Sequence, residues 1–418
     1  MKKVIFILLS LCLVGEVSAQ NADNYERIVR ELGSARFQGR GYAKDGVKKA
    51  SRFLANEFRK AGADDVGIQP FSIDINTFPG KMKMSVDGRR LKPGDDFSMR
   101  EFSPGVRGKY KLYFIDTLSY DSDRIFSDLS RKENENVFVV CDFWFTYKHG
   151  KDFKRLQSDT SVANAGLILT WDAPLKFYKA YGEKVSAKPV VWVMSDLVKG
   201  ASNVEFDIEN KFLPAYQTSN VIAKVDGERH DSCYVFVAHY DHLGNLGRRI
   251  WFPGVNDNAS GTAALVAIAG HYAKNRPQFD IVCIAVSGEE ANLRGSTYYV
   301  EHPTISLDRI KYLFDLDMIG DDNPVQYCEV SEPGNAGFAK MQCINAEKGY
   351  FRELRRGELA ANSDHWPFAL KGVPCILFEN ESGSNFPYYH TMHDDWSRVE
   401  LGTYPKIFGL VTDYISGK

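Results

Sequence analysis

The sequence predicts an α/β protein: a three-layer α/β/α domain with a mostly parallel central sheet, and a smaller β-rich domain inserted into it. Two patterns predict this class. Beyond Ser219, strand-like apolar runs alternate with helical segments, whereas strand-like runs follow one another from about residue 74 to 213. The length of 418 residues fits two to three domains of about 150 residues each.

The composition is that of an ordinary globular protein, with 44% hydrophobic and 25% charged residues. These fractions exclude a disordered, collagen-like or disulfide-dominated chain. The 52 basic and 54 acidic residues leave a net charge of -2, which gives no broad electrostatic basis for binding a nucleic acid. We therefore expect no nucleic acid among the partners.

Residues 1–19 have the pattern of a signal peptide. The basic start Met1-Lys2-Lys3 precedes an apolar run from Val4 to Val14, and Val17-Ser18-Ala19 places small residues at the cleavage position. The apolar run is much shorter than the roughly 20 residues that a membrane-spanning helix needs. We expect cleavage after Ala19, export to the periplasm or the extracellular space, and no stable membrane insertion.

Residues 20–73 are expected to form the N-terminal helical part of the main domain. One helix is predicted over residues 21–33, and a second follows from the helical spacing of apolar residues between Val47 and Ala61. Between the two helices, Phe37-Gln38-Gly39-Arg40-Gly41 predicts a turn. This segment lacks the remaining glycines and the preceding strand that a dinucleotide-binding loop requires.

Residues 74–213 are expected to form the inserted β-rich domain. Its one histidine, His149, has no neighbouring group of metal ligands in the sequence. The strands predicted here are Met82–Val86, Leu112–Ile115, Val137–Val140, Leu167–Leu169 and Val190–Met194.

Residues 214–418 are expected to hold the alternating strands and helices of the main domain. The predicted helices are Gly261–His271 and one that begins at Ser296. The predicted strands are Tyr234–Ala238, Ile281–Val286, Lys311–Met318 and Cys375–Phe378.

Six cysteines follow the signal segment, and no CxxC motif occurs. A cysteine-rich zinc site or a thioredoxin-like redox centre is therefore unsupported. Several of these cysteines lie in apolar strand-like runs, where a buried free thiol is the common state. A disulfide between Cys328 and Cys343 stays an open alternative, because export would permit it.

Acidic and imidazole side chains fall at the ends of the predicted strands of the main domain. Ligand sites in open α/β sheets form at the carboxyl edge of the strands, so these side chains are expected to meet in one cleft. The candidates are His239, Asp257, Glu289, Glu290, Asp317 and His390.

Two imidazoles and several carboxylates suit zinc, which accepts nitrogen and oxygen donors in open catalytic sites. One metal ion would need only three of them. The surplus of carboxylates therefore suggests two metal ions that share a bridging group. Adjacent glutamates point in different directions, so Glu290 is expected to bind a metal and Glu289 to hold a water as a base.

Six strings in this half of the chain resemble, in the same order, the motifs of the M28 family of co-catalytic zinc aminopeptidases. The region over which these matches run is roughly half of the chain. The strings are AHYDHLG (238–244), GVNDNASGTAAL (254–265), SGEEANLRGS (287–296), DLDMIG (315–320), SDHWPF (363–368) and YYHTMHDD (388–395).

The resemblance implies a function for each candidate, with two zinc ions (Zn2+) per chain. One zinc would be held by His239 and Asp317, the other by Glu290 and His390, with Asp257 bridging. Glu289 would be the general base, and the carboxylate of Asp241 would orient the ring of His239. The FQGRG loop and the insert resemble members of the family with a protease-associated (PA) domain.

Three other histidines compete for these functions. His242 is expected either to be structural or to support a metal ligand from behind. His393 is an alternative ligand three residues after His390, and His365 is a further rival. Asp364 is expected either to orient a group in the cleft or to cap a loop.

The expected reaction is hydrolysis of a peptide bond beside a free α-amine, which removes N-terminal residues from peptides. The absence of Gly-x-Ser-x-Gly weighs against a serine hydrolase. Two alternatives within the resemblance are a single-zinc glutaminyl cyclase and a carboxypeptidase of the same family. A metal-free binding protein is a third alternative, but it would be expected to have lost a ligand or the base.

Overall fold

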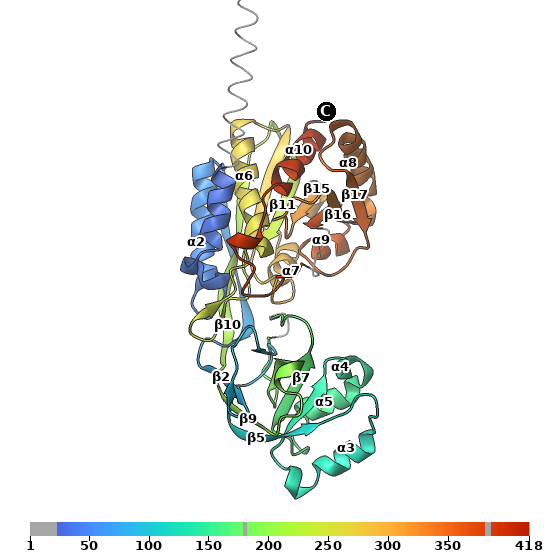
Figure 1. The fold of residues 1–418 in the computed structure, drawn as a ribbon. Coiled ribbons are helices and arrows are strands. Elements are labelled where there is room, and N and C mark those ends of the chain that lie inside the picture. The colour runs from blue at the N-terminus through green and yellow to red at the C-terminus, as the bar shows by residue number, and fades with distance from the viewer. Residues whose placement is uncertain (1–22, 179–181, 381–385, 418) are drawn as a thin grey trace, which may run out of the picture.

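The computed structural model describes residues 23–178, 182–380 and 386–417, and these form two lobes (Figure 1). The larger lobe contains an eight-stranded sheet and most of the helices, and the smaller lobe contains a second eight-stranded sheet. A short two-stranded sheet, β12 (Asn245–Leu246) with β13 (Ile250–Trp251), lies in the segment after His239. The expected signal peptide, residues 1–19, lies outside the described residues. Within the described residues, no helix is both long and apolar enough to cross a membrane.

The sheet of the larger lobe is parallel at its centre and has antiparallel pairs on both sides of that centre. Its four central strands, β14, β11, β15 and β18, are parallel to one another, whereas β1 and β10 on one side and β16 on the other pair antiparallel. The order is β1 (Asp65–Thr77), β10 (Lys211–Val225), β14 (Phe279–Val286), β11 (Arg229–His239), β15 (Ile310–Leu316), β18 (Cys375–Asn380), β16 (Val325–Val330) and β17 (Glu353–Gly357).

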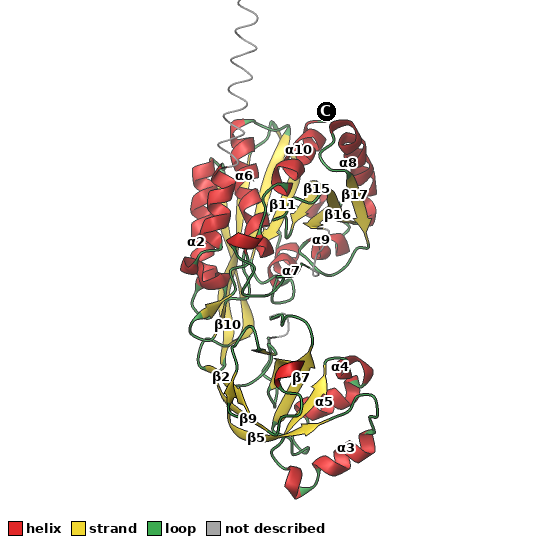
Figure 2. Ribbon diagram, viewed as in Figure 1, coloured by secondary structure: helices red, strands yellow, loops and turns green. Residues whose placement is uncertain are grey.

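Helices cover both faces of this sheet, which gives the expected three layers (Figure 2). One face packs against a helix over residues 23–32 and against α2 (Gly46–Ala61), α6 (Gly261–Lys274), α8 (Asn335–Lys348) and α10 (Thr403–Ser416). The other face packs against α7 (Arg294–Glu301) and α9 (His365–Leu370).

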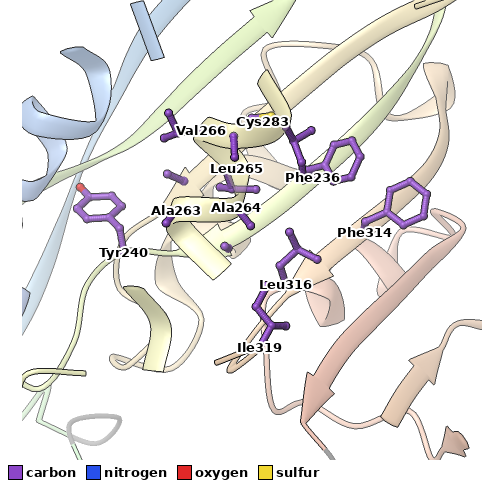
Figure 3. Packing of buried hydrophobic residues seen from close by; sticks show 14 of the residues in the cluster. Phe236, Tyr240, Ala263, Ala264, Leu265, Val266, Cys283, Phe314, Leu316 and Ile319 are labelled. Atoms are coloured by element: carbon purple, nitrogen blue, oxygen red, sulfur yellow. The ribbon is translucent and has the colours of Figure 1, made fainter. Parts of the chain in front are cut away.

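The main core lies between α6 and the central strands (Figure 3). α6 is apolar on almost every side, because it is enclosed between the sheet and α2. Phe236 of β11 stacks on Phe314 of β15 with the ring centroids 5.0 Å apart. Thr262 Oγ1 donates to the carbonyl oxygen of His239 at 2.6 Å, so the start of α6 is fixed to the end of β11.

The smaller lobe is built on a mixed sheet of eight strands. The order is β3 (Arg89–Arg90), β2 (Met82–Val86), β9 (Asn203–Ile208), β5 (Val106–Phe114), β6 (Phe138–Asp142), β7 (Gly166–Trp171), β8 (Val190–Met194) and β4 (Phe97–Met99). The apolar and β-branched runs of the sequence predicted five of these strands, namely β2, β5, β6, β7 and β8.

Three short helices of the smaller lobe were not predicted from the sequence. They are α3 (Ser122–Leu129), α4 (Phe145–Lys148) and α5 (Gly150–Ser158). Each buries only one side chain, Leu129, Phe145 or Leu156 respectively, so none carries a broad apolar stripe.

Two long strands connect the lobes. β1 and β10 pair along their whole length and cross the expected domain boundaries at residues 73/74 and 213/214. The lobes also share a buried cluster, in which Leu243, Leu246 and Phe252 of the larger lobe pack with the strands of the smaller one. The smaller lobe is therefore anchored on the segment that directly follows His239 and Asp241.

The six described cysteines are free thiols. Cys328 is buried and Cys343 is exposed, so the structure does not contain the disulfide that the sequence left open.

Candidate metal centre

The parallel strands bring the predicted residues together at one edge of the sheet. His239 is the last residue of β11, Asp317 directly follows β15, and Glu289 and Glu290 follow β14 after a short turn. β14, β11 and β15 are adjacent and parallel, so their carboxyl ends lie side by side. His390 reaches the same edge from the loop after β18.

Asp257 lies in the turn Val255–Ser260 that leads into α6. Polar neighbours hold this turn against the next strand: Asn258 Nδ2 donates to the Leu316 carbonyl at 2.8 Å, and Asn256 Oδ1 accepts from Gly320 N at 2.7 Å. The carboxylate of Asp394 accepts from the N–H groups of Asn256 and Asp257 at 2.9 and 3.0 Å. The Asp257 carboxylate is thus fixed from two directions.

Three side chains form the first group of the candidate centre: His239, Asp257 and Asp317. His239 Nε2 lies 3.2 Å from Asp257 Oδ1 and 3.3 Å from Asp317 Oδ1. Asp317 Oδ2 accepts a hydrogen bond from Ser363 Oγ at 2.7 Å, whereas Oδ1 has no hydrogen-bond partner among the described residues. The free oxygen of Asp317 therefore faces the imidazole.

The second group consists of Asp257, Glu290 and His390. His390 Nε2 lies 3.2 Å from Asp257 Oδ2 and 3.2 Å from Glu290 Oε2. The other oxygen of Glu290 lies 2.7 Å from His242 Nδ1, which is also 3.7 Å from Asp257 Oδ1. Asp257 thus belongs to both groups and turns one oxygen to His239 and the other to His390.

The two groups fit divalent metal ions. Each places histidine nitrogen and carboxylate oxygen atoms within one small buried volume, which is the donor set that zinc accepts. The unpartnered oxygen of Asp317 supports this fit, since a buried carboxylate oxygen is normally paired. His239 with Asp257 and Asp317 could hold one ion, and Asp257 with Glu290 and either His242 or His390 a second.

Opposite charges in the second group shift the pKa values of its members. Burial raises the pKa of Glu290, but His390 and the contact with His242 outweigh it and bring the pKa to about 2. Burial lowers the pKa of His390, but Glu290 and Asp257 raise it to about 9. These carboxylates are therefore in the ionised form that binds a cation.

Glu289 occupies a different position from its neighbour. Its side chain is 14% exposed against 3% for Glu290, and its Oε2 lies 4.0 Å from His239 Nε2. Burial raises the pKa of Glu289 well above its usual range, and Glu290 and Asp364 add to this, whereas His239 opposes it. A carboxylate with raised proton affinity at the open side of the centre suits proton transfer.

Asp241 supports the centre mainly through its backbone and its hydrogen bonds. The Nδ1–H of His239 donates to the carbonyl oxygen of Asp241 at 3.1 Å, whereas the Asp241 carboxylate is 3.9 Å from that nitrogen. The carboxylate accepts from Glu289 N at 3.2 Å and from the hydroxyl of Tyr42 at 2.7 Å. The carbonyl of Asp241 thus orients the ring, and its carboxylate holds the Glu289 backbone.

The rival residues lie in distinct places. His393 is half exposed and pairs with Asp95 of the smaller lobe at 3.0 Å, outside both groups. His365 is buried between Asp315 at 3.3 Å and Glu329 at 3.5 Å. Asp364 accepts from Ser296 Oγ at 2.6 Å and makes no side-chain cap at the start of α9.

His242 lies beside the centre. It is completely buried and contacts the carboxylate of Glu290, which agrees with the expectation that it supports a metal ligand. Its position three residues after His239, in the loop at the same strand end, was the one available signal.

The chain matches known proteins over this region. Residues 220–415 match Peptidase family M28. A probable zinc metalloprotease of Leptosphaeria maculans is 26% identical over 63% of this chain and 65% of its own length. Aminopeptidase YwaD of Bacillus subtilis is 28% identical over 46% of this chain and 42% of its own length. The chain thus spans less than two thirds of the length of these curated relatives.

The fold has a counterpart among solved structures. The zinc aminopeptidase BSAP of Bacillus subtilis superposes with a TM-score of 0.74 over 94% of both chains, at 22% sequence identity. The likeness therefore covers both lobes. The fold is thus that of this solved structure, and the family match shows that the chain carries a Peptidase family M28 domain over residues 220–415.

Proposed function

We propose that this protein is an exported metallo-exopeptidase that removes N-terminal residues from peptides with the help of two zinc ions. The observation that carries the proposal is the position of Asp257, whose two oxygens each lie 3.2 Å from a different imidazole, His239 or His390. A carboxylate shared in this way is the bridging group of a two-metal site. The names of the relatives, an aminopeptidase and a probable zinc metalloprotease, support the same activity.

Each side chain has a distinct function in this proposal. His239 and Asp317 hold one ion, Glu290 and His390 the other, and Asp257 bridges them. When bound, the two ions supply Lewis acidity that acidifies water and polarises a carbonyl group. Glu289 accepts a proton at Oε2 and passes it to the leaving amine.

The selection of a free α-amine follows from the charge of the site. Asp317 and Glu289 lie on the same side of the centre, around His239, and both carry acidic groups. An ammonium group is attracted to such carboxylates. A blocked N-terminus lacks this charge and is expected to react poorly.

The test combines metal analysis with a substrate panel. Metal-replete protein is assayed for zinc per chain and incubated with aminoacyl p-nitroanilides, their N-acetyl counterparts, a peptide with a free C-terminus only, and an N-terminal glutaminyl peptide. We expect close to two zinc ions and hydrolysis of the unblocked anilides alone. A single zinc ion together with cyclisation of the glutaminyl peptide would indicate a glutaminyl cyclase instead. Release of C-terminal residues would indicate a carboxypeptidase.

Export is proposed from the sequence of residues 1–19. N-terminal sequencing of the protein from the periplasm or the medium should begin at Gln20. A stable membrane-bound form that retains Met1 would contradict export without affecting the proposed activity.

We also propose that about residues 74–213 act as a metal-free inserted domain, PA-like in position, that shapes access to the centre. The contact of its Phe177 N–H with the carbonyl of His390, at 3.0 Å, supports this function.

A further inference from the structure

The segment Phe37–Tyr42, for which the sequence predicted only a turn, contains a completely buried arginine. Arg40 is 0% exposed, and its guanidinium donates five hydrogen bonds to main-chain carbonyl oxygens. The acceptors are Tyr240 (2.8 Å), Leu32 (3.1 Å), Pro253 (2.7 Å), Gly254 (2.7 Å) and Asp257 (2.9 Å).

Four of the five acceptors, all except Leu32, lie on the two segments that carry the candidate ligands. Tyr240 stands between His239 and Asp241 at the end of β11. Gly254 and Asp257 belong to the turn before α6, and Asp257 is the residue shared by both groups. Arg40 thus ties the strand that carries His239 to the turn that carries Asp257.

Tyr42 makes a second connection from the same segment. Its hydroxyl donates to Asp241 Oδ2 at 2.7 Å, and the tyrosine is buried. The other oxygen of Asp241 accepts from Glu289 N, and the carbonyl of Asp241 accepts from His239 Nδ1. Through Asp241, Tyr42 therefore reaches His239 of the first group and the proposed base Glu289.

Close packing keeps this segment in place. A Cβ atom on Gly41 would lie 2.2 Å from the Cα of Gly244, and one on Gly39 would lie 2.4 Å from the carbonyl oxygen of Phe252. Only glycine permits the backbones to approach so closely. The segment is therefore locked onto the loop that follows His239.

We infer that Arg40 and Tyr42 are positioning residues of the metal centre: Arg40 aligns the shared carboxylate of Asp257, and Tyr42 aligns Asp241 beneath His239. The inference rests on the proposed two-metal function. Neither side chain touches a candidate ligand's donor atom. Both act through the groups that fix those atoms, an arrangement in which loss of a supporting partner typically costs 10- to 100-fold in metal affinity.

The variants Arg40→Lys and Tyr42→Phe test the inference. Lysine keeps the charge but offers three donors on one nitrogen in place of five on a planar fork, so it cannot make all of the bonds to the two segments. Phenylalanine removes only the hydroxyl. Zinc affinity is measured by calorimetric titration of the metal-free full chain, and thermal unfolding of the metal-free proteins reports separately on folding.

Matched controls lie away from the centre. Tyr350→Phe removes a similar hydroxyl bond to a carboxylate, Asp413 Oδ2 at 2.9 Å. Arg59→Lys changes an arginine that also donates to a main-chain carbonyl, that of Val66 at 3.4 Å. Both controls should bind zinc as the unmodified protein does.

We expect Arg40→Lys to weaken both zinc-binding steps by about 10- to 100-fold and Tyr42→Phe to weaken one step by a similar factor. Two double variants identify the zinc-binding step that Tyr42→Phe weakens. The loss of zinc affinity should persist when Tyr42→Phe is combined with His390→Ala, and it should vanish when Tyr42→Phe is combined with His239→Ala. Unchanged zinc affinities in Arg40→Lys and Tyr42→Phe, with lower melting temperatures only, would overturn the inference. Failure of the unmodified protein to bind two zinc ions would instead overturn the proposed function.

Discussion

The ring of Tyr178, on the smaller lobe, lies 4.7 Å from the imidazole of His390, on the larger lobe, in an edge-to-face arrangement. The same imidazole also stacks on the ring of Tyr389, with the centroids 3.8 Å apart. The adjacent Phe177 N–H donates to the carbonyl of His390 at 3.0 Å. The smaller lobe thus contacts a candidate zinc ligand directly, so the two lobes are coupled at the centre as well as along β1 and β10.

This contact predicts a metal-binding defect from a residue outside the M28 domain. Tyr178→Ala removes the ring that limits the movement of His390, and zinc affinity at the second group should fall roughly tenfold. Tyr178→Phe keeps the ring and should bind zinc normally. Competition with a chromogenic chelator measures both variants. Tyr147→Ala, at a tyrosine 71% exposed on the same lobe, is the control, and equal affinities in all three variants would refute the coupling.

The second prediction concerns Glu289. Glu289→Gln keeps the size of the side chain but cannot accept a proton, so turnover should fall by about 10²- to 10⁴-fold while zinc content and folding persist. Steady-state kinetics on an aminoacyl anilide and metal analysis of the same sample measure the two effects. Loss of zinc from Glu289→Gln would show that this residue binds metal instead.

Glu290→Gln should give the opposite result. Its carboxylate lies between His390 and His242, and its pKa of about 2 reflects that charged environment. Replacing the charge should lower zinc occupancy first, and excess zinc should recover part of the activity. Full zinc occupancy and full activity in this variant would show that the proposed functions of the two glutamates must be exchanged.

A third prediction separates the competing histidines. His242→Ala leaves one oxygen of Glu290 without its partner at 2.7 Å, so zinc affinity should fall by about 10- to 100-fold. His393→Ala removes a half-exposed side chain that pairs with Asp95, and zinc binding should not change. Zinc titration of both variants decides between them. A loss of zinc affinity in His393→Ala, with none in His242→Ala, would support His393 as the alternative ligand.

The sequence predicted what local patterns encode. The strand ends that carry His239, Asp317 and Glu290 follow from short apolar runs with an acidic or imidazole residue after them. Because these strands are parallel and adjacent, their carboxyl ends meet at one edge of the sheet. The long strands β1 and β10 were not predicted from the sequence. Their outer halves extend beyond the main sheet, and β1 lacks a continuous apolar run.

The contacts of Arg40 and His242 could not be read from local spacing. Arg40 donates to carbonyls 200 to 217 residues further along the chain, and main-chain acceptors leave no mark in the sequence. An arginine in a glycine-rich segment therefore predicts a turn, and only the three-dimensional structure identifies the groups it joins.

The last prediction is that zinc stabilises the folded chain through the shared carboxylate. Asp257, Glu290 and Asp317 are buried together, and binding of zinc to the folded state alone stabilises it by about 2.7 kcal/mol at a free concentration 100 times the Kd. Chelation should therefore lower the melting temperature, and added zinc should restore it. Asp257→Asn should lose most of this shift, because it weakens both groups at once, whereas Asp95→Asn should retain it. If Asp257→Asn keeps the full zinc-dependent shift, then Asp257 does not bridge two ions.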